Sequence, residues 1–327
     1  MAREKTFNTP GDDPSNSKRK RRHREWSSAT LALLIGIGGL ILGRTGVLWI
    51  RFDVFAQFTV QLALLCLAAA IGIAMPRFKA LVTAAIFVAL LAGYGLWPYL
   101  ATAGAEKPLM ANEKRLRVMQ FNVHAAALNA GEALATIKLL DPDIVSLVEI
   151  DNANKPLLEA LKANYPYQAT CWQIRGCETA ILSRLALTTP TSQADWEGAD
   201  YIMTTLGPEF GNLRLVSSHT TRFPFARAQL MQVQFLATTL QGRAPLIVMG
   251  DFNATPFSRV TIGFAESLGL QMQTYLPSWP ADKLMPQLAI DHIFTSPGIR
   301  ALDHEVVGPA SGSDHLPVAI TLAIATH

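Results

Sequence analysis

The chain has 327 residues and a formal net charge of +3; half of its residues are hydrophobic and 16% are charged. The first 25 residues carry +4, whereas the segment from Thr102 onward has 16 basic and 20 acidic residues. This mildly acidic segment disfavours strong nonspecific binding to duplex nucleic acid, whose affinity comes largely from neutralised phosphates, but it leaves room for a nuclease with a local basic rim.

The N-terminal third consists of a polar tail followed by three apolar blocks. Residues 1–26 end in the basic run Lys18–Arg24 and are expected to form a disordered cytoplasmic tail rather than a nucleic-acid-binding arm. Three apolar blocks follow within residues 27–101, at Ser27–Gly43, Val54–Ala74 and Leu81–Ala101. Each is long enough to cross a membrane as a helix, so the sequence predicts three transmembrane helices.

The orientation of these predicted helices follows from the basic run. Lys18–Arg24 should stay inside the cytoplasm, and three crossings then place everything after Ala101 outside it. If the third block lies on the membrane surface instead, the orientation inverts.

After a linker at residues 102–112, residues 113–327 alternate between short strands and amphipathic helices, which predicts one α/β domain with a two-sheet core. Helices are expected at Ala127–Leu140, Pro224–Leu240 and Val260–Gly269. Strands are expected at Leu116–Phe121, Ile144–Val148, Tyr167–Ile174, Thr179–Leu182, Tyr201–Leu206, Leu213–Ser217, Leu246–Gly250, Ala289–Thr295, Glu305–Val307 and Val318–Ala323.

Two of the three cysteines lie six positions apart in this domain. Cys171 and Cys177 could close a hairpin as a disulfide in an oxidising compartment, or remain two free thiols. Without a nearby histidine or further cysteine they give no zinc signal. Cys66 lies inside the second apolar block and is expected to be a small packing residue.

The most informative stretch is Pro245–Pro256. Its apolar start reads as a buried strand that ends at Gly250 and then presents Asp251 and Asn253 on one side of the chain. An acid and an amide at the end of a buried strand suit the handling of a water molecule or an anion. An ordinary Asx turn would give the same pattern.

Similar polar residues stand at the ends of the other apolar strands. A buried carboxylate costs several kcal/mol unless it is paired or bound to a metal, so these acids need a common explanation. Taken singly, each residue fits a capped turn, an exposed acid or a structural histidine. The set comprises Asn122, Glu149, His219, Asp251, Asn253, Asp291, Asp314 and His315.

In this order, the set resembles the endonuclease/exonuclease/phosphatase superfamily, over about Leu116–Leu322. The resemblance implies a four-layered α/β sandwich, in which two mixed β-sheets lie face to face and helices cover them. The apolar blocks and the Trp279–Pro280 loop are similar to a bacterial membrane-anchored branch, which implies a multi-pass inner-membrane protein with a periplasmic catalytic domain. Two features depart from the pattern: Val148 stands where glutamine is common, and long DNA-gripping loops are not evident.

The resemblance also implies roles for these residues. Glu149, with Asn122 and Asp314, would hold Mg²⁺ or Mn²⁺. Asp251 would orient or deprotonate the attacking water and Asn253 would hold it. His315, oriented by Asp291, would donate to a phosphoryl oxygen or act as a base, and His219 would bind the phosphate or help protonate the leaving group.

Three functions from different classes remain open. The first is a metal-dependent phosphoesterase that hydrolyses phosphodiesters or phosphomonoesters by in-line attack of water, with an endonuclease as one form of it. The second is a phospholipid or sphingomyelin-type phosphodiesterase, and the third is a noncatalytic membrane-anchored binding module. The expected partners are a phosphate-ester substrate and the membrane, with no protein partner evident. A basic groove around the site would favour nucleic acid, and an apolar rim would favour lipid.

Overall fold

The computed structural model describes residues 14–74, 107–124, 129–188, 190–193, 199–283, 287–309 and 311–326. The chain divides into two compact units. Of the described residues, 14–41 and 60–74 belong to the first unit, and residues 42–59 and those from 107 onward belong to the second. Residues 42–59, expected to belong to a membrane region, therefore pack with the α/β unit.

The first unit is helical where the structure describes it. Helix α1 (Pro14–Arg44) begins inside the segment for which disorder is expected, and α3 (Thr59–Ala74) packs against it. Cys66 and Leu62 of α3 lie against Gly36 and Gly39 of α1, where a glycine leaves room for the neighbouring side chain. Cys66 thus has the packing role expected for it.

The second apolar block is not one continuous helix. It breaks at Phe58 between α2 (Asp53–Gln57) and α3. Among the described residues no single helix is both long and apolar enough to cross a membrane, although Ile50–Gln57 and Thr59–Ile73, bent by 62° to one another, reach that length and composition as a pair. The third block, Leu81–Ala101, lies outside the described residues.

Two mixed β-sheets form the centre of the second unit. Within the described residues the first sheet runs β11-β13-β1-β2-β4-β3, with β12 also paired to β13, and the second runs β5-β6-β7-β8-β10-β9. The pairs β1–β2 and β7–β8 are parallel and the other pairs are antiparallel. The first sheet holds β1 (Glu113–Asn122), β2 (Ile144–Val148), β3 (Tyr167–Thr170), β4 (Thr179–Ser183), β11 (Arg300–Ala301), β12 (Val306–Val307) and β13 (Val318–Ala325). The second holds β5 (Thr191–Gln193), β6 (Asp200–Thr205), β7 (Arg214–His219), β8 (Leu246–Asp251), β9 (Gln271–Met272) and β10 (Asp291–Thr295).

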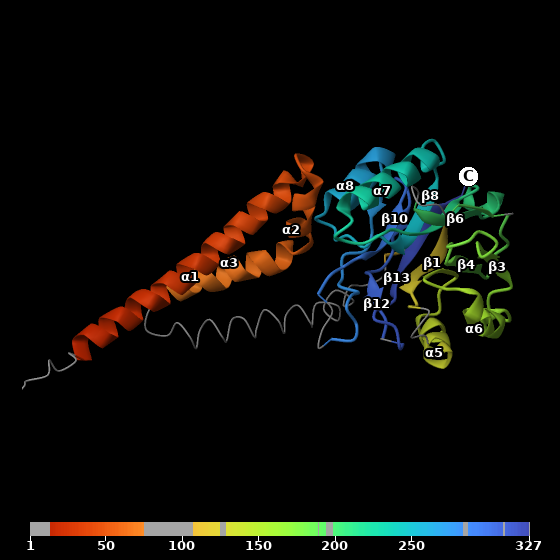
Figure 1. The fold of residues 1–327 in the computed structure, drawn as a ribbon. Coiled ribbons are helices and arrows are strands. Elements are labelled where there is room, and N and C mark those ends of the chain that lie inside the picture. The colour runs from red at the N-terminus through yellow and green to blue at the C-terminus, as the bar shows by residue number, and fades with distance from the viewer. Residues whose placement is uncertain are drawn as a thin grey trace, which may run out of the picture. The chain divides into compact units, whose positions relative to one another are not determined.

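Helices cover the outer face of each sheet, as Figure 1 shows. The first sheet packs on α5 (Ala130–Leu140) and α6 (Lys155–Leu161), and the second on α7 (Ala226–Leu240) and α8 (Arg259–Leu268). A third cluster of buried residues, including Leu116, Ile144, Leu215 and Ile247, fills the space between the sheets. The expected two-sheet α/β sandwich with helices outside is therefore confirmed.

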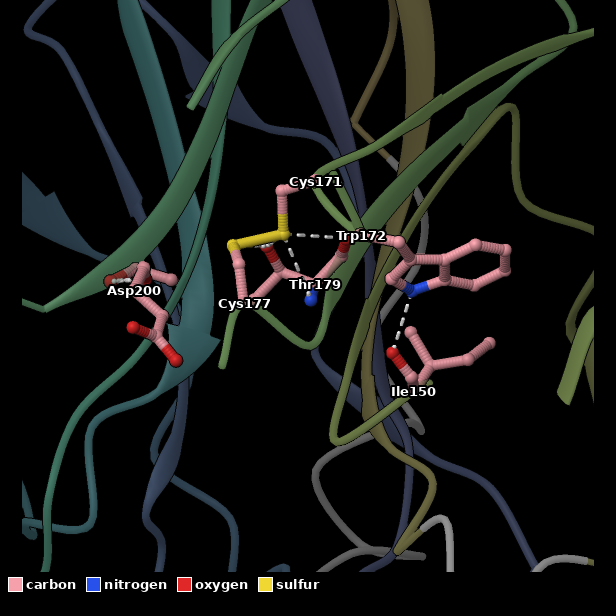
Figure 2. The surroundings of a disulfide bond; sticks show 7 residues. Ile150, Cys171, Trp172, Cys177, Thr179 and Asp200 are labelled. Atoms are coloured by element: carbon pink, nitrogen blue, oxygen red, sulfur yellow. Dashed lines mark hydrogen bonds between the residues drawn. A yellow bond between two sulfur atoms is a disulfide. The ribbon is translucent and has the colours of Figure 1, made fainter. Parts of the chain in front are cut away.

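A disulfide joins Cys171 to Cys177 in the connection between β3 and β4. Figure 2 shows Trp172 of this connection reaching Ile150, whose carbonyl accepts a 2.9 Å hydrogen bond from the indole Nε1. The amide of Ile150 also donates to the Glu178 carbonyl at 3.1 Å. The bridged hairpin thus fixes the backbone immediately after Glu149.

The expected elements recur with shifted ends, and several short ones were not expected. Strand β1 begins at Glu113 rather than Leu116, and α7 begins at Ala226 rather than Pro224. The unexpected elements are the helix α6 and the edge strands β5, β9 and β11. Each of these three strands has only two or three residues. Such short strands leave no measurable alternation in a sequence.

Gly250 allows β7 and β8 to lie close together. A Cβ atom at this position would sit 2.0 Å from the Ser218 carbonyl oxygen, which is backbone and cannot rotate away. We expect Gly250→Ala to lower the free energy of unfolding of the full chain by at least about 2 kcal/mol, because the two strands must separate. Gly263→Ala is the matched control, since nothing lies within 4 Å of a Cβ there. It should be neutral or stabilise α8 in urea unfolding by up to about 1 kcal/mol, and equal effects of the two variants would contradict the close approach.

Glu305 is a buried acid held at one oxygen only. Its Oε2 accepts from the amides of Tyr275 and Leu276 at 2.6 and 2.9 Å, whereas Oε1 has no hydrogen-bond partner among the described residues. Burial raises the pKa of Glu305 to about 8 from its usual 4.5, despite the two amides, which lower it. Between about pH 4.5 and pH 8 the folded state therefore keeps a proton that the unfolded chain loses, and the free energy of unfolding falls as the pH rises through this range.

We expect Glu305→Gln to remove this dependence, which amounts to about 1.4 kcal/mol per pH unit. Urea unfolding of both proteins at about pH 5 and about pH 7.5 measures the difference. Glu159→Gln, at an exposed glutamate, should keep the wild-type slope. A variant at Glu305 with the same slope as wild type would show that this carboxyl ionises normally.

Candidate active site

The strand ends bring the predicted site residues to one edge of the sandwich. Asn122 ends β1, Glu149 directly follows β2, and His219 and Asp251 end the parallel strands β7 and β8. Strand β10 runs antiparallel to β8, so that its first residue, Asp291, pairs with Asp251. His219 pairs with Asp251 on the other side. Asp251 thus lies between a histidine and a second acid.

Asn122 connects the two sheets through its side-chain amide. Its Nδ2 donates to Glu149 Oε1 at 2.9 Å and to Asp251 Oδ2 at 3.0 Å. The same nitrogen lies 3.4 Å from His315 Nε2. Its Oδ1 accepts from the amide of His124, which fixes the orientation of the group. A single buried amide therefore holds two carboxylates of different sheets.

Asp291 and His315 form the expected dyad. His315 Nδ1 lies 2.7 Å from Asp291 Oδ2, and Nε2 lies 3.7 Å from Asp251 Oδ2. Burial lowers the pKa of His315, but Asp291 and Asp251 outweigh it and raise that pKa to about 10. At Asp251 burial has the opposite effect: it raises the pKa of the carboxyl, and the nearby His315 lowers that pKa in part. The two groups share a strongly polar, water-poor environment.

His219 and Asn253 lie beside this dyad. Asn253 Nδ2 donates to the Thr220 carbonyl at 2.9 Å and lies 3.3 Å from His219 Nε2. The amide of Asn253 donates to Asp251 Oδ1 at 2.8 Å, so the Asx turn anticipated as the simpler interpretation is present together with the cluster. His219 Nε2 is 3.7 Å from Glu149 Oε1 and 3.8 Å from Asp251 Oδ2. His219 is therefore within reach of both acids.

Asp314 lies next to the cluster rather than at its centre. Its Oδ2 accepts from Trp279 Nε1 at 3.1 Å, and Oδ1 lies 3.1 Å from His124 Nδ1. His124 Nδ1 is also 3.7 Å from Glu149 Oε2. His124 therefore stands between the acids Asp314 and Glu149.

Three residues around the cluster have a left-handed backbone. The φ angles of His124, Glu149 and Asn253 are 46°, 54° and 47°. Asparagine and histidine adopt this region more often than most residues do, whereas glutamate rarely does, and a residue held there costs about 1–3 kcal/mol. Such conformations persist where the surrounding structure imposes them, and they concentrate at functional sites.

Sequence reasoning missed several of the residues that hold the site. His124 and Trp279 contact Asp314, Gln120 Nε2 lies 3.5 Å from Asp291 Oδ1, and Ser313 Oγ donates to the Asn122 carbonyl. Gln120 had a readable signal, since it alternates with Asn122 on one face of an apolar strand. His292, which follows Asp291, points elsewhere: it packs against Phe252 and Phe294, and burial lowers its pKa to about 4.

A cavity of about 850 Å³ opens onto the cluster. Glu149, His219, Asp251, Asn253 and His315 line one part of it. The remaining lining is mostly apolar or aromatic and comes from separate parts of the unit: Val54, Phe58, Phe223, Pro224, Phe225, Trp279, Leu288 and Ile290. Arg222 is the one arginine or lysine among the described lining residues.

The donor set at the cluster fits a hard divalent cation. Ligand atoms of Glu149, His219 and Asp251 lie within 4.8 Å of one another, as do those of Asp251, Asp291 and His315. Carboxylate oxygens are the ligands that Mg²⁺ and Mn²⁺ prefer. Of the other two predicted ligands, Asn122 turns its nitrogen toward the acids and Asp314 is held by Trp279 and His124. Glu149 and Asp251 are thus the ligands that this arrangement favours most.

Solved structures with this fold are similar over nearly their whole length. The human Nocturnin catalytic domain with bound sulfate is 22% identical, with a TM-score of 0.51, covering 67% of this chain and 97% of that one. A humanized TDP2 of D. rerio is 17% identical, with a TM-score of 0.54 and coverages of 64% and 98%. Sphingomyelinase C from Streptomyces griseocarneus is 14% identical, with a TM-score of 0.53 and coverages of 64% and 99%. These likenesses show the fold.

No curated protein sequence matches the chain. The model of the endonuclease/exonuclease/phosphatase family matches residues 119–315, a segment that contains every member of the cluster from Asn122 to His315. The family hydrolyses phosphate esters and its enzymes use divalent metals. The chain belongs to the endonuclease/exonuclease/phosphatase family.

Proposed function

We propose that the chain is a membrane-tethered, divalent-metal-dependent phosphodiesterase whose substrate carries an apolar group, with the headgroup diester of a membrane lipid as the leading candidate. The observation that carries this proposal is the Asn122–Glu149–Asp251–His315 cluster in a cavity with an apolar rim. Among the described lining residues a single arginine is available to neutralise phosphates, which is too little positive charge to bind a run of nucleic-acid phosphates tightly.

The chemistry is the attack of water on phosphorus. As the water oxygen bonds to phosphorus, its proton passes to Asp251 Oδ2, and the bond between phosphorus and the leaving oxygen breaks. His219, whose side chain is 23% exposed, gives the leaving oxygen a proton and regains one from solvent, and Asp251 releases to solvent the proton that it took from the water. Glu149 and Asp251 would hold a divalent cation, which would neutralise charge at the phosphoryl and leaving oxygens.

His315 and Asn253 position the reactants. Because Asp291 engages Nδ1 of His315, the opposite ring nitrogen is directed toward Asp251 and the cavity, where it can donate to a phosphoryl oxygen. Asn253 is anchored by Asp251 and Thr220 and holds the water beside its base. Asn122 keeps Glu149 and Asp251 at a fixed separation.

We propose further that the catalytic unit lies outside the cytoplasm of a bacterium, tethered to the inner membrane by the apolar helices. Two features support this location: the basic run before the first apolar block, and the Cys171–Cys177 disulfide, a bond that persists in oxidising compartments.

Asp251→Asn should abolish most of the proposed activity. With the full chain in detergent and Mg²⁺ or Mn²⁺, we expect release of p-nitrophenolate from bis-p-nitrophenyl phosphate and of headgroup from phospholipid vesicles. EDTA should stop both reactions, and added metal should restore them. The variant should lose at least about 10²-fold in kcat/KM, whereas Asp282→Asn, at an exposed acid outside the cavity, should keep wild-type rates.

Plasmid DNA and RNA serve as competing substrates in the same assay. Cleavage of either in preference to phospholipid, with the same dependence on metal and on Asp251, would replace the lipid substrate by nucleic acid. Full activity of Asp251→Asn would contradict the mechanism. Absence of turnover on all substrates would favour a noncatalytic binding module.

The location can be tested through the three cysteines. After acid trapping and denaturation of whole cells, a maleimide-polyethylene glycol should modify one cysteine, Cys66, before reduction and all three after it. Cys66→Ser should give no adduct before reduction. Three adducts without reduction would show that Cys171 and Cys177 are thiols in the cell, and this would contradict an extracytoplasmic catalytic unit.

A further inference from the structure

The short helix α2 forms part of the catalytic cavity although it is far from the family-matched segment in sequence. Val54, Gln57 and Phe58 line the same cavity as Glu149 and His315. All of these residues belong to the second unit of the chain. The family match begins only at residue 119, so this part of the wall is an addition to the segment that the family defines.

Asp53 fastens α2 to the α/β sandwich. Its side chain is 2% exposed, and its two carboxylate oxygens accept from Ser258 Oγ and from the amide of Arg259. The amide lies in the first turn of α8, where the helix dipole also favours a negative charge. A buried carboxylate is costly without such partners, so the contact is a specific one.

Gln57 and Ala56 add a second point of attachment. Gln57 Oε1 accepts from the amide of Thr255 at 2.6 Å, and the Ala56 carbonyl lies 3.4 Å from Thr255 Oγ1. Thr255 is two residues after Asn253, the asparagine that holds Asp251. Helix α2 therefore binds Thr255, in the turn that directly follows the active-site residue Asn253.

Two of the three residues that this segment contributes to the cavity, Val54 of α2 and the following Phe58, are apolar. Phe58 is 43% exposed and Val54 is half-buried, and their hydrocarbon joins the partly exposed rings of Phe223 and Phe225 in the lining. Apolar surface of this kind, next to a cluster of acids and histidines, favours a ligand with one charged and one hydrocarbon portion.

We propose that α2 and Phe58, the residue that follows it, form the substrate-selecting wall of this site, with Phe58 and Val54 binding the hydrocarbon arm of a phosphate diester and Asp53 acting as the positioning residue that anchors the wall. This inference rests on the proposed phosphodiesterase function and adds to it the residues that select the substrate. An alkyl chain makes the same kind of apolar contact in a lipid and in a small alkyl ester, so small alkyl esters can test whether the wall binds hydrocarbon.

The test compares two chromogenic diesters, methyl and butyl p-nitrophenyl phosphate, with the full chain. Wild type should prefer the butyl ester by about tenfold in kcat/KM, since three additional methylenes are partly buried. Phe58→Ala should reduce this preference by at least about threefold, because the butyl group loses the ring that buries it. Leu48→Ala is the matched control, because Leu48 is apolar, 84% exposed and outside the cavity lining. It should keep the wild-type preference.

Asp53→Ala should reduce the preference as Phe58→Ala does, because the wall loses its anchor. Asp53→Asn keeps one acceptor oxygen and should fall between Asp53→Ala and wild type, and a graded loss of this kind distinguishes anchoring from general unfolding. If Phe58→Ala leaves the preference intact, the wall is not α2. If only Asp53→Ala leaves it intact, Asp53 is not the anchor.

Binding of methyl and butyl phosphate, measured by calorimetry in the presence of Mg²⁺, separates the two proposals. Without turnover of either ester, a preference of wild type for butyl phosphate that Phe58→Ala reduces at least about threefold would leave the wall standing and overturn the phosphodiesterase. Turnover of both esters with no effect of Phe58→Ala on rates or binding would support the phosphodiesterase and overturn the wall.

Discussion

The site depends on the Asn122 amide, whose two hydrogens bind carboxylates that belong to different sheets. Packing between the sheets is apolar and sets their separation without fixing small displacements along the strands. Two directional bonds from one planar group do fix them. Since Asp251 is almost completely buried, these bonds and the neighbouring His315 also offset the cost of desolvating its charge. The two hydrogen bonds that fix the sheets relative to one another thus also assemble the polar edge.

The surroundings of this amide impose a strained arrangement and then stabilise it. Glu149 has a positive φ that glutamate rarely adopts, and the bridged hairpin after it holds Ile150 through Trp172 and the Glu178 carbonyl. On the other sheet, Gly250 lets β7 and β8 approach so that His219 and Asp251 stand side by side. Rigid backbone on both sides gives preorganisation, which is what positioning catalysis requires.

Sequence reasoning located the cluster because strand ends are easy to recognise: a polar residue stops an apolar run, and parallel neighbours end at the same edge. Asn122, Glu149, His219 and Asp251 were found in this way and do lie together. His124 and Trp279 were not, because their contacts to Asp314 come from loops that have no period. The predicted roles in metal binding and proton transfer stay predictions.

The N-terminal region shows why composition alone does not separate α2 from α3. An apolar block has the same hydropathy whether it faces lipid or lines a cavity, so Val54–Ala74 reads as one span. The distinction lies in Asp53 and Gln57, single polar residues whose partners, Ser258 and Thr255, are about two hundred positions away. No local pattern encodes such a pair. Because the turn held by Gln57 leads directly from Asn253, a change at α2 reaches the active site through two residues of backbone. The helix and the site are therefore expected to respond to mutation together, although only one of them lies in the family-matched segment.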